Sequence, residues 1–214
     1  RDTITLSREA ERLGADILSI ITPSFAVASQ QELYDHYCAV AAHVDTPIVL
    51  YNIPARTGNK LLPETVCRLA KDVEVIKGAK DSSGDWENLK AYIQLTKDLD
   101  FSVLSGNDSL ILPALKEGGV GGIAGCSNVY PKVLSSIYEL FQEGKLDEAQ
   151  AAQDSIASFR AVFKYGNPNT VVKTAVAMLG YNVGKCRAPF NQLPQEGLEA
   201  LEKVLQENKD KGMC

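Results

Sequence analysis

The sequence is poor in the residues that metal sites and disulfide-stabilised folds require. It has two histidines among 214 residues, His36 and His43, and both fall in a helical pattern. Its five cysteines are scattered and form no CxxC pair; they are Cys38, Cys67, Cys126, Cys186 and Cys214. These absences disfavour a metal site, a disulfide framework and a histidine-based catalytic triad, and free thiols in a reducing cytosol are the simplest interpretation.

Long apolar runs and excess positive charge are also lacking. No run approaches the ~20 apolar residues of a membrane helix, and residues 1–8 have no apolar core of a signal peptide. The net charge of −5 and the pI of about 5.2 argue against a nucleic-acid-binding surface. No GxGxxG follows a first strand, which disfavours dinucleotide binding. With 45% hydrophobic residues, the chain suits one soluble, cytoplasmic α/β domain with a sizeable core.

Short apolar runs alternate with helical patterns in the first 130 residues. A helix is expected at 3–14, and further helices from Ser29, which opens a capping box with Glu32, from Pro63, from Asp85 and from Asn107. The expected strands are 16–22, which reads as buried on both faces, 48–52, 73–80, 101–106 and 121–125. Strict alternation predicts parallel strands with right-handed crossovers.

From Pro131 onward, helices follow one another without strands. They are expected at about 131–143, 146–164, 170–179 and 195–208. We therefore predict a barrel portion, 1–130, and C-terminal helices, 131–214, that complete the same domain.

Short strands with polar or glycine residues at their C-terminal ends favour a (β/α)8 TIM barrel with extra C-terminal helices, because the site of such barrels forms at that end. Five strands do not close an eight-stranded barrel. We therefore expect its first three strands to lie outside this sequence.

Lys80 ends one of the predicted buried strands. Burial there is expected to lower the lysine pKa and to free the amine as a nucleophile. Such an amine can form an imine with a 2-oxo acid, without any cofactor, and the iminium then serves as an electron sink. Tyr51, near the end of the preceding strand, could move the protons. A lysine is more often a solvated surface group, and we expect Lys77 in the same strand to be one.

Two motifs that contain Tyr51 and Lys80 resemble segments of a known protein family. Residues 51–58 (YNIPARTG) and 77–85 (KGAKDSSGD) closely resemble segments of the dihydrodipicolinate synthase and N-acetylneuraminate lyase family. Residues 104–108 (LSGND), 121–128 (GGIAGCSN) and 172–180 also look like family segments. The family consists of class I, pyruvate-dependent aldolases and lyases on a (β/α)8 barrel.

The resemblance implies a role for each of five residues. Lys80 matches the Schiff-base lysine and Tyr51 the proton-relay tyrosine. Gly106 and Ile123 match positions that line the pyruvate pocket through backbone groups. Arg56 matches the arginine that, in the synthase branch, holds the carboxylate of aspartate semialdehyde. A 2-oxo acid and an aldehyde are thus the implied partners, and a homotetramer built from dimers is the implied assembly.

Some features leave alternatives open. The family's threonine pair and glycine–glutamate motif are expected upstream of Arg1, and Phe25 stands where the synthase has a tyrosine that reaches into a neighbouring subunit. Residues 81–84 (DSSG) look more like the branches that cleave sugar acids. The alternatives to a synthase are therefore an N-acetylneuraminate lyase or 2-keto-3-deoxy sugar-acid aldolase, or a non-catalytic barrel fragment or paralogue.

Overall fold

The structure, a computed structural model, describes residues 1–190 and 192–213 of the chain. The chain divides into two compact units, Arg1–Ile123 and Ala124–Cys214. No helix in the described ranges is long and apolar enough to cross a membrane. Cys38, Cys67 and Cys186 are free thiols, whereas Cys214 lies outside the described residues.

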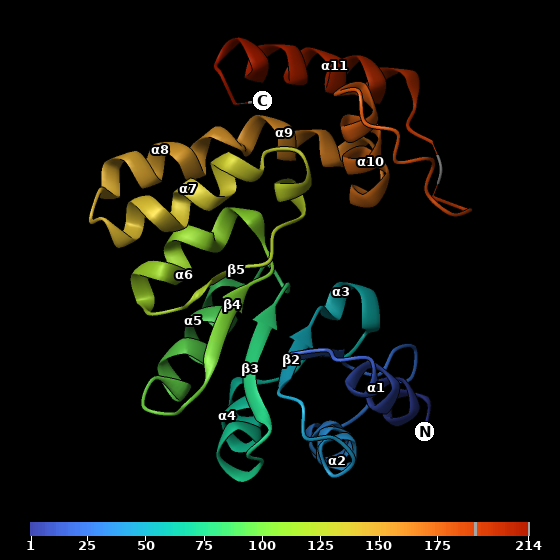
Figure 1. Cartoon of the computed structure of the whole chain (residues 1–214), viewed down its shortest axis with the longest axis vertical. Helices are drawn as coiled ribbons and strands as arrows, with labels where there is room; N and C mark the ends of the chain where they lie inside the picture. The colour runs from blue at the N-terminus through green and yellow to red at the C-terminus, as the bar shows by residue number, and fades with distance from the viewer. Residues whose placement is uncertain (191, 214) are drawn as a thin grey trace. The chain divides into compact units, whose positions relative to one another are not determined.

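The first unit is built on a parallel sheet whose strand order follows the sequence (Figure 1). Its five strands are β1 (Leu18–Ile21), β2 (Ile48–Asn52), β3 (Ile76–Asp81), β4 (Ser102–Ser105) and β5 (Gly121–Gly122). Each strand pairs in parallel with the next. The parallel α/β sheet predicted from the alternating pattern is therefore confirmed, and parallel strands bring all their C-terminal ends to one edge.

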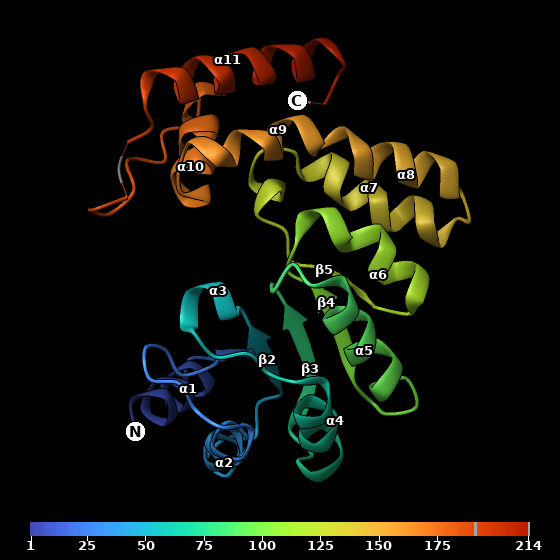
Figure 2. The same cartoon turned by 180° about the vertical axis from the view of Figure 1, so that it is seen from behind.

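Helices connect successive strands and pack against one another beside the sheet (Figures 1 and 2). They are α1 (Asp2–Arg12), α2 (Gln30–Ala41), α3 (Pro54–Thr57), α4 (Pro63–Asp72), α5 (Trp86–Thr96), the 3₁₀ helix η1 (Asp108–Leu110) and α6 (Ile111–Glu117). A core of buried aliphatic and tyrosine side chains lies between these helices and the strands; it includes Leu33, Tyr37, Ile48, Leu50, Leu69, Ile76, Leu89 and Tyr92.

Local sequence explains where the helices begin. The predicted capping box of Ser29 and Glu32 is present, with the Ser29 side chain accepting from the Glu32 N–H at 3.3 Å. Pro63 occupies the first turn of α4, where its missing N–H costs nothing. Asp85 caps α5 through the Asn88 N–H.

The strands differ from the prediction in their burial and in their bounds. β1 alternates between buried and exposed residues, with Ile21 44% exposed, so the prediction of a strand buried on both faces is wrong there. The described sheet pairs β1 with β2 alone, so the other edge of β1 has no strand partner among the described residues. β3 begins at Ile76, because Val73 caps α4 and accepts the Ile76 N–H at 3.0 Å, and it extends one residue past Lys80.

Helices are the regular secondary structure of the second unit in its described residues, and an irregular segment separates the last two of them. Its elements are η2 (Gly125–Asn128), α7 (Pro131–Gln142), α8 (Leu146–Ser155), α9 (Ala157–Ala161), η3 (Val162–Tyr165), α10 (Pro168–Met178) and α11 (Gln195–Asp210). The helix expected over 146–164 is thus divided into α8, α9 and η3. The structural boundary after Ile123 precedes the expected boundary at residue 130, and the completion of one domain by both parts stays a prediction.

Aromatic packing holds the centre of the second unit. The rings of Tyr130 and Phe159 meet edge to face with centroids 5.3 Å apart, and both side chains are fully buried. Asn208, on α11, donates from Nδ2 to Tyr130 Oη at 2.9 Å. This buried hydrogen bond ties the last helix to the start of α7.

Candidate active site

Tyr51 and Lys80 are direct neighbours on adjacent strands. They are register partners in β2 and β3, so their side chains leave the sheet on the same face. Lys80 Nζ lies 4.0 Å from the centroid of the Tyr51 ring, and both residues are half-buried. The sheet thus brings together an amine and a phenol, the two groups that the sequence assigns to imine formation and proton transfer.

The two lysines of β3 have different surroundings. Lys77 Nζ forms an ion pair with Asp100 at 2.7 Å at the surface, as expected for a solvated lysine. Within residues 1–190 and 192–213, the Lys80 amine has neither a hydrogen bond nor an ion pair, and its neighbour is the Tyr51 ring. An amine that is committed to no carboxylate can act as a nucleophile once it loses its proton.

Gly106 borders the Lys80 side chain from the end of β4. A Cβ at position 106 would lie 2.9 Å from Lys80 Cε and would overlap Ser82 Oγ. A side chain at position 106 would therefore displace the lysine stem or the Ser82 hydroxyl, whereas the backbone angle of Gly106 is one that other residues adopt. The Gly106 N–H donates to the Asp81 carbonyl at 2.8 Å, so this donor is already used within the sheet.

Ile123 follows β5 and Arg56 lies in α3. The Ile123 N–H donates to the Ser105 carbonyl at 2.8 Å, and its side chain is 48% exposed. Tyr51, Lys80, Gly106 and Ile123 thus stand at or just past the ends of four successive strands. The Arg56 side chain is exposed and has no ion pair with any described residue, and the short helix that carries it was not predicted.

A buried polar pair lies one residue beyond Tyr51 and Lys80 on the same two strands. Asn52 donates from Nδ2 to Asp81 Oδ1 at 2.7 Å, and these residues are 0% and 2% exposed. Burial raises the pKa of the Asp81 carboxyl, while hydrogen bonds from Ser83 and Asn52 act to lower it. Sequence reasoning missed this pair, although both residues lie inside the two motifs that drew attention to the site.

Ser82 carries a buried hydroxyl beside Lys80. Its Oγ is shielded from solvent and has no hydrogen-bond partner among the described residues. A buried hydroxyl without a partner is costly, and it leaves a polar group ready for a bound molecule.

Phe25 stands on a loop that buried side chains hold in place. It has a left-handed φ of 80° and is fully exposed. Asn59 fixes the loop by donating from Nδ2 to the carbonyls of Pro23 and Ala26 and accepting the Ala28 N–H at 2.7 Å. The phenyl ring has no hydroxyl and cannot transfer a proton.

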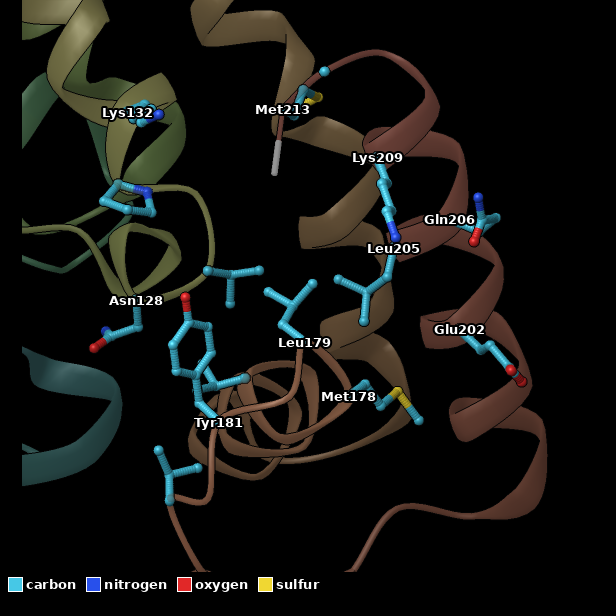
Figure 3. A pocket seen from close by; sticks show the side chains of 15 residues that line it. Asn128, Lys132, Met178, Leu179, Tyr181, Glu202, Leu205, Gln206, Lys209 and Met213 are labelled. Atoms are coloured by element: carbon cyan, nitrogen blue, oxygen red, sulfur yellow. The ribbon is translucent and has the colours of Figure 1, made fainter.

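A hollow of about 1020 Å³ in the second unit lies apart from these residues in the sequence (Figure 3). Leu179 and Leu205 form part of its apolar wall, and Lys132, Lys209 and Tyr181 contribute polar groups. None of the five predicted site residues lines it.

Nearly the whole chain matches a known protein family. Residues 1–208 match the Dihydrodipicolinate synthetase family. The chain belongs to this family. The resemblance that the two sequence motifs carried is thereby confirmed, and it extends over nearly the whole chain.

Relatives in this family are more than one-third identical to the chain over the aligned residues. A 4-hydroxy-tetrahydrodipicolinate synthase from Methanospirillum hungatei is 37% identical over 205 residues, which cover 95% of this chain and 69% of the relative. The enzyme of the same name from Archaeoglobus fulgidus is 38% identical, covering 96% of this chain and 70% of the relative.

Solved structures of family members superpose closely. Dihydrodipicolinate synthase from Thermotoga maritima has a TM-score of 0.91 at 31% identity, covering 96% of this chain and 70% of its own. A prophage protein of the family from E. coli K12, solved in complex with pyruvate, also has a TM-score of 0.91, at 28% identity and with 100% and 72% coverage.

Proposed function

We propose that this chain is a pyruvate-dependent lyase of the class I aldolase type, with 4-hydroxy-tetrahydrodipicolinate synthase activity. Pyruvate and aspartate semialdehyde are its substrates in this proposal, and no cofactor takes part. The observation that carries the proposal is the uncommitted amine of Lys80, 4.0 Å from the Tyr51 ring. The names of relatives at 37–38% identity support the same activity.

The chemistry begins at Lys80 Nζ. The neutral amine adds to the ketone carbon of pyruvate, and the resulting carbinolamine loses water to give a protonated imine. Loss of a proton from the pyruvate methyl group yields an enamine, whose carbon attacks the aldehyde. The Tyr51 hydroxyl carries protons to and from these intermediates, since it belongs to the ring that borders the amine.

Substrate binding uses the surrounding strand ends. Arg56, exposed and without an ion pair among the described residues, is proposed to bind the carboxylate of the aldehyde substrate. Gly106 and Ile123 line the pyruvate pocket in this proposal; because their N–H groups serve the sheet and carbonyls cannot donate to the oxygens of pyruvate, their contribution would be the shape of the pocket.

The finer architecture belongs to the same proposal. The five parallel strands would be part of a (β/α)8 barrel with C-terminal helices, in a homo-oligomer built as a dimer of dimers. The superposition on family members with TM-scores of 0.91 supports the barrel.

Borohydride reduction in the presence of pyruvate tests the proposal. The protein should gain the mass of one reduced pyruvate adduct, and Lys80→Arg should gain none. Lys77→Arg is the matched control and should still form the adduct. A protein that forms no adduct and binds no pyruvate would instead support the non-catalytic alternative.

Cleavage of a sugar acid is a second candidate, which the Ser82 hydroxyl favours. A buried oxygen without a partner, adjacent to Lys80, could hydrogen-bond to a hydroxyl of N-acetylneuraminate or a 2-keto-3-deoxy acid. Parallel assays of pyruvate consumption and pyruvate release separate the two reactions. If release from sugar acids is faster and Ser82→Ala abolishes it while Arg56→Ala does not, this candidate replaces the synthase.

A further inference from the structure

Asn52 and Asp81 face each other across β2 and β3, just as Tyr51 and Lys80 do one residue earlier. Asn52 follows Tyr51 and Asp81 follows Lys80, and the two pairs are consecutive in the register of β2 and β3. Successive side chains of a strand point to opposite faces, so Asn52 and Asp81 project away from the reactive pair. Their hydrogen bond joins the two strands on the helix-covered side of the sheet, one residue beyond Tyr51 and Lys80.

The backbone alone does not fix the register along the whole of these strands. Ile48 pairs with Ile76, but Val49 pairs with Gly78, so the register shifts at the start of β2. Such an irregularity leaves one residue of the longer strand without a direct partner. Because a slip of one residue would move Lys80 to the other face, the C-terminal ends of β2 and β3 need their own lock.

Asn52 and Asp81 also tie in the segments that follow the strands. The Asn52 Oδ1 accepts the Leu61 N–H at 3.0 Å, just after the loop that follows α3. Asp81 Oδ2 accepts the Ser83 hydroxyl at 2.7 Å, and Ser83 Oγ accepts the Asp85 N–H at 3.1 Å at the start of α5. One buried network therefore holds both strand ends and the loops that leave them.

We infer that Asp81, through its bridge to Asn52, is a positioning residue that keeps Lys80 over the Tyr51 ring. The reaction that this positioning would serve rests on the proposed function, whereas the positioning itself does not. A buried carboxyl is costly even when it is hydrogen-bonded. The presence of Asp81 at this position is therefore consistent with a role in fixing one arrangement of β2 and β3. Loss of the bridge frees the two strand ends to shift relative to each other.

An exchange of the two residues provides the sharpest test. In the double variant Asn52→Asp/Asp81→Asn, the new carboxylate can still accept from the Leu61 N–H and from the new amide. That amide can still accept from Ser83 with its oxygen. Two single variants break the bridge: Asn52→Asp opposes two carboxyls, and Asp81→Leu, which is similar in size, leaves the Asn52 amide without its acceptor.

The first readout needs no substrate. Lysines are methylated reductively with 13C-formaldehyde, and the Lys80 signal is assigned by its absence in Lys80→Arg. The Tyr51 ring should shift this signal away from those of solvated lysines. Each single variant should move it toward the solvated value, and the double variant should restore it. Asp100→Asn, which removes the partner of Lys77 on the same strand, is the control and should leave it unchanged.

The second readout is the rate of borohydride-trapped adduct formation at saturating pyruvate, measured on folded protein. Each single variant should lose about 10²-fold, as expected for misplacement by about 1 Å, with recovery in the double variant. Single variants that keep both the Lys80 signal and the trapping rate, with only a lower melting temperature, overturn the inference. If the signal responds as expected but wild-type protein forms no adduct, the inference stands and the proposed function fails.

Discussion

Gly106 and Lys80 are in close contact: a methyl group at Gly106 would lie 2.9 Å from Lys80 Cε. The lysine stem therefore passes through space that only glycine leaves open at the end of β4. A side chain at position 106 would therefore compete with both Lys80 and Ser82 for this space.

Gly106→Ala should displace the lysine stem or the Ser82 side chain. Overpacking of this kind costs about 1–3 kcal/mol of stability, and the trapping of pyruvate on Lys80 should slow as well. Chemical denaturation and adduct formation measure the two effects. Gly125→Ala, where an added Cβ meets nothing within 4 Å, is the control. Equal effects at both positions would contradict this account.

Tyr51→Phe removes the hydroxyl and keeps the ring beneath Lys80. The amine should stay in place, while proton transfer loses its carrier, so kcat should fall by about 10²–10⁴. Steady-state kinetics provide the measurement. Tyr34→Phe, which removes a hydroxyl bound to Asp72 at the surface, should leave kcat unchanged. Retention of full activity by Tyr51→Phe would remove the tyrosine from the mechanism.

Arg56→Ala should weaken binding of an acidic aldehyde. We expect KM for aspartate semialdehyde to rise, with little change in the trapping of pyruvate on Lys80, because the two substrates use different groups. Arg8→Ala, another exposed arginine, controls for loss of charge. An unchanged KM in Arg56→Ala would contradict the assignment of this residue.

Asp81 should make stability depend on pH in a defined direction. Burial raises its pKa above the ordinary value of 3.8, so the folded state keeps this proton to higher pH than the unfolded state does. Its contribution to the free energy of unfolding therefore falls as pH rises from about 3.8 through the raised pKa, and is constant above it. The difference between wild type and Asp81→Asn, from urea unfolding at several pH values, should show this fall.

Asp35→Asn, at an exposed position, controls for the loss of one charge. A wild-type-minus-variant difference that is as flat for Asp81→Asn as for Asp35→Asn would contradict the buried, proton-retaining carboxyl.

Tyr130→Phe tests the core of the second unit. It would leave the Asn208 amide buried without its 2.9 Å acceptor, which costs about 1–3 kcal/mol. Thermal or urea unfolding measures the loss. Tyr138→Phe, on the exposed side of α7, should have little effect, and equal stability of the two variants would contradict the role of this hydrogen bond.

The sequence predicted the repeating elements because their signals are local. Alternation of apolar runs with helical patterns predicted a parallel sheet, and the capping box at Ser29 predicted the start of α2. The positions of Lys80 and Tyr51 at neighbouring strand ends followed from the same alternation. Each of these features depends on residues close together in the chain, so each can be read without the fold.

Features that depend on distant residues were missed. The pairing of Asn52 with Asp81 and the contact of Gly106 with Lys80 join segments that lie far apart in the sequence. The burial of β1 was also misjudged, since an apolar run does not reveal how many neighbours its strand has. The sequence therefore did not predict the exact ends of the strands or the side-chain pairs that form across the sheet.

We expect one amine, Lys80 Nζ, to form the covalent bond to pyruvate. Peptide mapping of the borohydride-reduced protein by mass spectrometry tests it most directly, because Lys77 on the same strand serves as an internal control. The account predicts the reduced pyruvate adduct on Lys80 and an unmodified Lys77. An adduct spread over several lysines, or located on Lys77 with Lys80 unmodified, would contradict it.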